Sequence, residues 1–245
     1  MSPGAPDGRQ AIRFEDVSFS YGRKIVFERF SCVFPVGRNL LLGPNGAGKS
    51  TLLQLAVGLK RLDIGTLNPA PDASIGYMPQ HIRPIGGLSV CEQIAYCGWL
   101  KGLGKREAKA EALVALERVD LAEVASTQST RLSGGQIRRL GLAQSLIGSP
   151  GWLLLDEPTA GLDPDQRDRF ARLIGDLDVP VIVATHQVED IGSLFDHVVV
   201  LLPSRAPYSS PVADFLALDG GGRGDAVAAY RAACAIVESR QGNDI

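Results

Sequence analysis

A glycine-rich run of eight residues is the first group whose spacing predicts a chemical function. Residues 43–50 read GPNGAGKS and match the pattern G-x-x-x-x-G-K-[ST]. Glycines let the backbone wrap so that successive N–H groups point inward, and such a loop at a helix N-terminus binds anions. We expect Lys49 to reach the terminal phosphates of a nucleotide and the Ser50 hydroxyl to ligate Mg²⁺. A chance match in a chain of this length arises roughly once in a hundred sequences.

Two carboxylates follow an apolar run later in the chain. Residues 152–155 read WLLL, and Asp156 and Glu157 come directly after them. Because burial of the strand would fix the position of acids at its end, we expect Asp156 to hold the Mg²⁺ shell. Glu157 is then expected to orient and polarise the attacking water. Acids at the end of a buried strand are otherwise often helix N-caps, but the phosphate loop upstream favours the catalytic interpretation.

A second candidate anion site lies at residues 132–136, which read LSGGQ. A serine and two glycines at a predicted helix N-terminus present a hydroxyl group and free N–H groups. The alternative is a simple N-cap and turn, which Ser133 would also satisfy. Two separate anion sites on one chain favour the functional interpretation.

The LSGGQ sequence resembles the motif that marks ABC-family ATPases and separates them from other phosphate-loop enzymes. The resemblance covers residues 11 to about 200, with the motifs in the family's order and spacing. It implies that the LSGGQ segment closes over the γ-phosphate bound by the phosphate loop of a second subunit, so that two head-to-tail chains enclose two ATP molecules. The implied cofactors are ATP and Mg²⁺. The implied partners are a second ATP-binding subunit, identical or related, and separate transmembrane permease subunits.

The same resemblance implies roles for residues outside these motifs. Tyr21 resembles the aromatic residue that stacks on adenine, Gln80 the glutamine that senses Mg²⁺ and water, and His186 the histidine that faces the γ-phosphate. Residues 161–163, GLD, resemble the loop that passes contacts across the dimer. A core aromatic is the alternative for Tyr21, a surface position for Gln80 and a structural role for His186.

The predicted site residues fall into three groups. The nucleotide contacts are Tyr21, Gly43, Asn45, Gly46, Gly48, Lys49, Ser50, Thr51, Ser133, Gly134, Gly135, Gln136 and Asp163. The catalytic residues are Glu157, His186 and Gln80, and the Mg²⁺ ligands are Ser50, Gln80 and Asp156.

The elements that must position these residues follow from hydrophobic periodicity. Residues 12–20 and 25–36 alternate apolar and polar residues around a turn at 21–23, which predicts an antiparallel strand pair. Buried parallel strands are predicted by short apolar runs at 39–42, 75–78, 152–155 and 179–184. Helical spacing is found at 50–59, at 164–177 and, with breaks, between 90 and 146. The alternation predicts an α/β fold, a phosphate-loop NTPase core with a mainly parallel sheet, an N-terminal antiparallel β-subdomain and an inserted α-helical subdomain.

The predicted organisation has four parts. They are a flexible N-terminus at 1–10, an ABC ATPase domain at 11–219 with a helical subdomain at about 82–146, a Gly-rich linker at 220–224, and a C-terminal helix and tail at 225–245. Val227, Tyr230, Cys234 and Val237 share one face of that helix, which is expected to dock on the parent domain in preference to a partner.

Two further local predictions concern prolines and charged residues. Pro203 and Pro207 cannot donate ladder hydrogen bonds, so the hairpin that many relatives have after the histidine is expected to be shortened or replaced by a loop. Arg138, Arg139 and the charged run at 105–111 are expected to be solvated helix faces.

Composition excludes several classes of function. The chain has 25 basic and 27 acidic residues, so it lacks the one-signed field typical of proteins that bind nucleic acid or anionic lipid directly. Its four cysteines show no C-x-x-C spacing and predict reduced cytosolic thiols. The longest apolar runs fall well short of the roughly 20 residues of a bilayer-spanning helix. We therefore expect a soluble chain without an export signal, cytoplasmic and peripheral on the inner face of the cell membrane.

The favoured hypothesis is the ATP-hydrolysing motor of a transporter. ATP binding would close the dimer, hydrolysis would reopen it, and the segment 80–101 would pass the motion to the membrane subunits. Residues 76–80 and 99–103 look more like exporter subunits than importer subunits. One alternative is a soluble ABC ATPase such as an iron–sulfur cluster assembly ATPase. A small-molecule kinase is a weaker alternative, because it leaves LSGGQ and His186 without roles.

Overall fold

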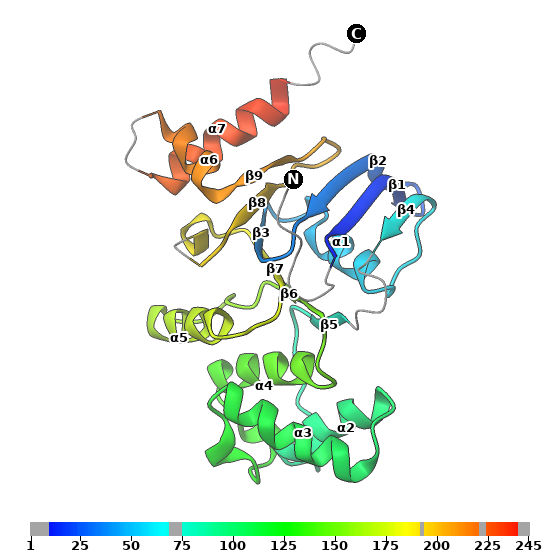
Figure 1. Ribbon diagram of the computed structural model, residues 1–245, viewed down its shortest axis with the longest axis vertical. Helices are drawn as coiled ribbons and strands as arrows, with labels where there is room; N and C mark the ends of the chain where they lie inside the picture. The colour runs from blue at the N-terminus through cyan, green and yellow to red at the C-terminus, as the bar shows by residue number, and fades with distance from the viewer. Residues whose placement is uncertain (1–9, 69–74, 192–193, 221–223, 240–245) are drawn as a thin grey trace. The chain divides into compact units, whose positions relative to one another are not determined.

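The computed structural model describes residues 10–68, 75–191, 194–220 and 224–239 (Figure 1). The chain divides into two compact units: unit 1 contains Met1–Ala73 and Pro180–Ile245, and unit 2 contains Ser74–Val179. The predicted flexible N-terminus lies outside the described residues except for Gln10, and so do residues 221–223 of the predicted linker. Both units combine strands and helices, so the chain has the predicted mixed α/β fold.

Unit 1 begins with a three-stranded antiparallel sheet. Its strands, in the spatial order β2-β1-β4, are β1 (Ile12–Tyr21), β2 (Lys24–Phe34) and β4 (Ile64–Asn68). Tyr21 pairs with Lys24, so the first two strands form the predicted hairpin around a two-residue turn. Alternate residues of both strands form a phenylalanine cluster in which Phe14 contacts Phe30 and Phe34 edge to face.

The remaining strands of unit 1 carry the phosphate loop. β3 (Arg38–Leu42) pairs in parallel with β7 (Val181–Thr185) on one side and with β8 (His197–Val200) on the other. Its three leucines are completely buried, as predicted for a central strand. The helix α1 (Lys49–Ala56) follows the loop. The helix prediction reached residue 59 and was too long, because the N–H groups of Leu59 and Lys60 donate to the Gln54 carbonyl and close the helix earlier.

A short hairpin follows β8. β9 (Tyr208–Pro211) pairs with β8 in the antiparallel direction, with Val200 opposite Tyr208. The intervening loop contains both Pro203 and Pro207, so neither proline interrupts a ladder, and each strand has only four residues. A short hairpin is thus present at this position, and a loop that contains both prolines joins its strands.

The C-terminal helices pack within unit 1. After α6 (Val212–Leu216), α7 (Ala226–Ser239) buries Ala229, Ala233 and Val237 and contacts α6, β8 and β9. Docking on the parent domain is thus confirmed. The predicted buried face was only partly right: Val237 is buried, Tyr230 and Cys234 are intermediate in exposure, and Val227 is 38% exposed. Val227 lies about 200° around the helix from Ala229, where the stripe of residues at a spacing of four begins.

Unit 2 combines parallel strands with α-helices (Figure 1). β5 (Ile75–Met78) pairs with β6 (Trp152–Asp156), and β6 is completely buried or nearly so along its whole length. The helices are α2 (Val90–Leu100), α3 (Lys105–Arg118), α4 (Gly134–Leu146) and α5 (Pro164–Gly175). The first three of these pack against one another.

The arginines of α4 correct a prediction. Arg139 is only 7% exposed, and its Nη1 donates to the carbonyl oxygens of Val119 (3.2 Å) and Asp120 (2.7 Å), just beyond the end of α3. Helix C-termini leave carbonyl groups without intrahelical donors, and Arg139 supplies donors in that region. The expected solvated face is therefore wrong for Arg139, whereas the charged residues at 105–111 are largely exposed, as predicted.

All four cysteines are free thiols, as predicted. Within the described parts of the chain, no helix is both long enough and apolar enough to cross a membrane.

Candidate functional site

The phosphate loop connects β3 to α1 in unit 1. Gly46 and Gly48 have φ values of +84° and +103°, a conformation that side chains other than glycine rarely adopt. At this end of α1, no side chain of the described residues caps the helix, and the first turn contains no acid. The first N–H groups of the helix and its positive dipole end therefore face the loop, which suits a phosphate group.

The ammonium group of Lys49 lies over this loop. Lys49 is 6% exposed, and its Nζ donates to the carbonyl oxygens of Gly43 (2.7 Å) and Pro44 (3.3 Å). A buried positive charge directly beside an open helix N-terminus complements a di- or triphosphate. Ser50 and Thr51 follow in the first turn of α1, and Thr51 is buried.

Tyr21 lies close to the same helix at the end of β1. Tyr21 is 45% exposed, and its hydroxyl oxygen is 3.4 Å from the Thr51 hydroxyl oxygen. Lys60 places its ammonium 4.7 Å from the ring centroid. The sequence offered no signal for Lys60, because the contact joins residues far apart in the chain. An exposed aromatic face beside the phosphate loop is a suitable surface for a purine.

His186 follows β7 at the edge of the sheet that also bears the phosphate loop. Leu42 pairs with Thr185 in the parallel β3–β7 ladder, so Gly43 and His186 each come directly after paired residues. The carboxyl ends of parallel strands form the usual ligand-binding edge of such sheets. His186 is exposed at this edge, and the N–H of Gln187 donates to the Thr185 hydroxyl at 3.1 Å.

In unit 2, Gln80 and the two carboxylates share a sheet edge. Met78 pairs with Leu155, so Gln80 and the pair Asp156 and Glu157 follow adjacent parallel strands. Both acids are buried, whereas Gln80 is exposed. Glu157 has φ +48°, a left-handed conformation that is uncommon for a residue other than glycine.

The LSGGQ segment begins α4. The Ser133 hydroxyl accepts from the N–H of Gln136 (3.4 Å), and the Gln136 side chain accepts from the N–H of Ser133 (2.9 Å). The N-cap role considered for Ser133 is thus present, and it leaves Ser133 and Gly134 exposed. A Cβ at Gly135 would lie 2.5 Å from Gln166 Oε1, so the flexible Gln166 side chain would have to shift to admit a larger residue. Asp163 caps α5 by accepting from the N–H of Gln166 at 2.9 Å.

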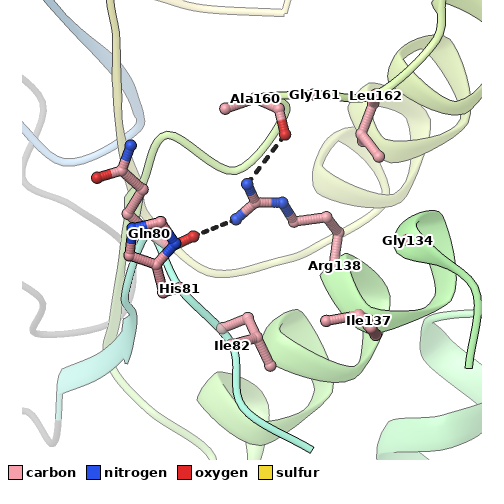
Figure 2. Close-up of a pocket in the computed structure, with 9 residues that line it drawn as sticks. All are labelled: Gln80, His81, Ile82, Gly134, Ile137, Arg138, Ala160, Gly161 and Leu162. Atoms are coloured by element: carbon pink, nitrogen blue, oxygen red, sulfur yellow. Dashed lines mark hydrogen bonds between the residues drawn. The ribbon is translucent and has the colours of Figure 1, made fainter. Parts of the chain in front are cut away.

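A pocket of about 270 Å³ lies between segments of unit 2 (Figure 2). It is lined by the residues after β5, the first turns of α4 and the turn at 160–162. Arg138 extends across it and donates to the backbone carbonyls of Gln80 and Ala160. The prediction that Arg138 belongs to a solvated face is wrong, since its side chain is half-buried between these carbonyls.

The proposed Mg²⁺ ligands are all oxygen donors. Ser50 supplies a hydroxyl in unit 1, and Asp156 and Gln80 supply a carboxylate and an amide oxygen in unit 2. Oxygen ligands of this kind suit Mg²⁺, which usually takes only one or two protein ligands beside phosphate oxygens and water. Each of these donors is therefore of a type that suits the ion.

Comparison with known proteins decides the family. A family model described as ABC transporter matches residues 31–160, more than half of the chain. The chain belongs to the ABC transporter family. Within this family it is an ATP-binding subunit and an ATPase, as the LSGGQ resemblance implied.

Three curated relatives indicate the range within the ABC transporter family. The zinc import ATP-binding protein ZnuC of Cereibacter sphaeroides is 35% identical over 200 residues, which cover 78% of this chain and 80% of ZnuC. The linearmycin resistance ATP-binding protein LnrL of Bacillus subtilis is 31% identical and covers 78% of this chain and 66% of LnrL. The Nod factor export ATP-binding protein I of Sinorhizobium fredii is 36% identical, with coverages of 80% and 61%. One of these relatives is named for import and another for export, so the relatives do not decide the direction of transport for this chain.

Solved structures share the ABC fold. An inward-facing structure described as an ABC transporter of metal-chelate type has a TM-score of 0.75 and 27% identity, and covers 84% of this chain and 85% of that chain. A second structure, the ATP binding subunit of an ABC transporter, has a TM-score of 0.72 at 21% identity, and covers 86% and 94%.

Proposed function

We propose that this ATP-binding subunit works as one half of a pair and drives transport through separate membrane-spanning permease subunits. The observation that carries the proposal is the presence of two helix N-termini suited to phosphate on one chain, at Gly48 and at Ser133. A helix N-terminus with exposed N–H groups and a hydroxyl attracts an anion. The Ser133 end of one copy, together with Asp163, closes over the triphosphate that the Lys49 loop of the other copy holds, so that each ATP lies between two subunits.

Different residues of each subunit are assigned to nucleotide binding, to Mg²⁺ binding and to hydrolysis. Tyr21 stacks on the adenine, and the loop around Lys49 binds the phosphates through N–H groups and a fixed positive charge. Bound Mg²⁺, held by Ser50, Asp156 and Gln80, would neutralise charge that develops on the phosphate oxygens. Glu157 orients and polarises the attacking water, and His186 contacts the γ-phosphate.

Contact with the permease is assigned to the segment 80–101. At the end of α2, Tyr96 stacks on Trp99 with ring centroids 5.9 Å apart. Both rings are about half-exposed, and Leu100 beside them is 62% exposed. Exposed apolar groups of this size are typical of interaction surfaces, which supports a protein partner at this position and a peripheral location on the membrane.

For the direction of transport we infer export. The inference is supported by the Nod factor export relative and by the exporter-like segments 76–80 and 99–103. The permease should be purified with the chain from detergent-solubilised membranes and its cargo identified. ATP-driven accumulation of that cargo in inside-out vesicles supports export, and accumulation only in right-side-out vesicles contradicts it.

A pair of variants tests the hydrolytic mechanism. Glu157→Gln keeps the shape of the side chain but removes its charge, so it should bind ATP normally and lose roughly 10²–10⁴-fold in turnover. It should also accumulate as an ATP-bound dimer in size-exclusion chromatography with light scattering. Lys49→Ala should lose ATP affinity itself, because it removes the charge beside the phosphates. A fully active Glu157→Gln variant, or one that stays monomeric with ATP, would contradict the proposal.

A further inference from the structure

Arg138 joins two segments of unit 2 that are far apart in the sequence. Its Nη1 donates to the carbonyl of Gln80, and its Nη2 donates to the carbonyl of Ala160 at 2.9 Å (Figure 2). Both acceptors belong to irregular backbone, one after β5 and the other in the turn after β6. Such segments lack the ladder or helix bonds that hold regular elements in place. The hydrogen bonds from the Arg138 guanidinium therefore help to hold both backbone segments in place.

The contact with Ala160 leads directly to Glu157. The N–H of Ala160 donates to the Glu157 carbonyl at 3.2 Å, so Arg138 holds the far side of the turn that Glu157 begins. Glu157 itself is in the left-handed region at φ +48°. Strained backbone of this kind persists only where the surrounding structure holds it. The Arg138 bond is one of the contacts that does so.

The positive charge of Arg138 also interacts with the negative charge of Glu157. Burial lowers the pKa of its guanidinium, and the negative charge of Glu157 acts in the opposite direction. The guanidinium is planar and presents several donors in a rigid fork, so it can bond two divergent carbonyls at once. A lysine ammonium at the end of a flexible stem cannot reproduce both bonds with the same geometry.

We propose that Arg138 is a positioning residue for ATP hydrolysis, which sets the backbone of Gln80 and of the Glu157 turn relative to the LSGGQ helix. Arg138 lies about one and a half turns after Ser133, the N-cap of α4, whose side chain forms the capping box with Gln136. A shift of this helix end is therefore passed through one side chain to the residues that contact water and Mg²⁺. The inference rests on the proposed roles of Glu157 and Gln80.

The test compares Arg138→Met with Arg138→Lys in the full chain. Misplacement of catalytic groups by about 1 Å can cost a factor on the order of 10² in rate, so kcat of Arg138→Met should fall by roughly ten- to a hundred-fold. The Kd for ATP should change by less than about twofold, because the phosphate loop is untouched. Arg138→Lys, which can restore one bond, should have an intermediate kcat.

Arg169→Met is the matched control. Arg169 is also on a helix of unit 2, and its guanidinium is paired with Asp120 at 3.0 Å on the surface. The same substitution there should leave kcat unchanged. Adding Arg138→Met to Glu157→Gln should not lower the residual turnover further, because the two residues act through one step.

The outcomes separate the inference from the function it rests on. If Glu157→Gln is inactive while Arg138→Met retains wild-type kcat, the inference about Arg138 is overturned and the proposed function stands. A kcat loss fully matched by loss of folded protein or of ATP binding, measured by urea unfolding and calorimetry, also overturns it. If Arg138→Met does not fold, Arg138→Lys decides, with full activity refuting the inference. An active Glu157→Gln variant would instead refute the proposed function.

Discussion

Replacement of Gly48 by alanine probes how far the phosphate loop depends on backbone that only glycine adopts without strain. At Gly48, where φ is +103°, an added Cβ would lie 2.9 Å from Phe27 Cζ and 3.1 Å from Val26 Cγ1. Gly46 has φ +84°, but a Cβ there would meet no atom of the described residues within 4 Å. The two positions share the backbone strain and differ in the steric contact, so Gly46→Ala is a matched control.

The expected magnitudes follow from these two contributions. A left-handed conformation costs a residue other than glycine roughly 1–2 kcal/mol. Overpacking in a well-packed core adds roughly 1–3 kcal/mol, and Phe27 belongs to such a core because it is only 3% exposed. We therefore expect Gly46→Ala to lose about 1–2 kcal/mol of unfolding free energy and Gly48→Ala about 2–5 kcal/mol.

Part of this cost should appear as weaker nucleotide binding. If the substituted loop relieves the strain by changing its conformation, it must adopt the strained conformation again to bind phosphate. Each 1.4 kcal/mol that this conformational change costs lowers the affinity for ATP about tenfold. Gly48→Ala should thus weaken ATP binding by at least about tenfold. Urea unfolding and isothermal titration calorimetry measure the two effects. Equal destabilisation by both variants would refute the steric argument, and unchanged ATP affinity of Gly48→Ala would refute the assigned loop geometry.

Two further predictions concern unit 2. Arg139→Met leaves the carbonyls of Val119 and Asp120 without their buried donor and should lower the unfolding free energy by roughly 1–3 kcal/mol in urea titrations, with ATP affinity preserved. Hydrogen bonds from the backbone and side chain of Ser89 lower the pKa of Glu92, so its ionised form stabilises the fold above its unfolded pKa of about 4.3. The stability difference between wild type and Glu92→Gln should shrink as pH falls below that value, and a pH-independent difference would contradict the lowered pKa of Glu92.

The sequence by itself determined the segments whose structure depends on local geometry. The GPNGAGKS loop needs positive φ at its glycines and is followed by a helix without an acidic first turn, and both properties are visible in the residue types. The apolar run at 152–155 is typical of a strand buried on both faces, and such a strand places Asp156 and Glu157 at its end. For the same reason the strands at 39–42 and 75–78 were predicted at their observed positions.

Only the tertiary structure decided the surroundings of the long polar side chains and the buried face of the last helix. Helical spacing tells which face a residue occupies but not which backbone lies opposite, and the carbonyls that Arg138 contacts are 58 and 22 residues away in the chain. In α7, hydropathy favoured Val227 as a buried residue. The small residues Ala229 and Ala233 are buried instead, because they allow the helix to approach the rest of unit 1 closely. Such contacts depend on partners that local sequence does not specify.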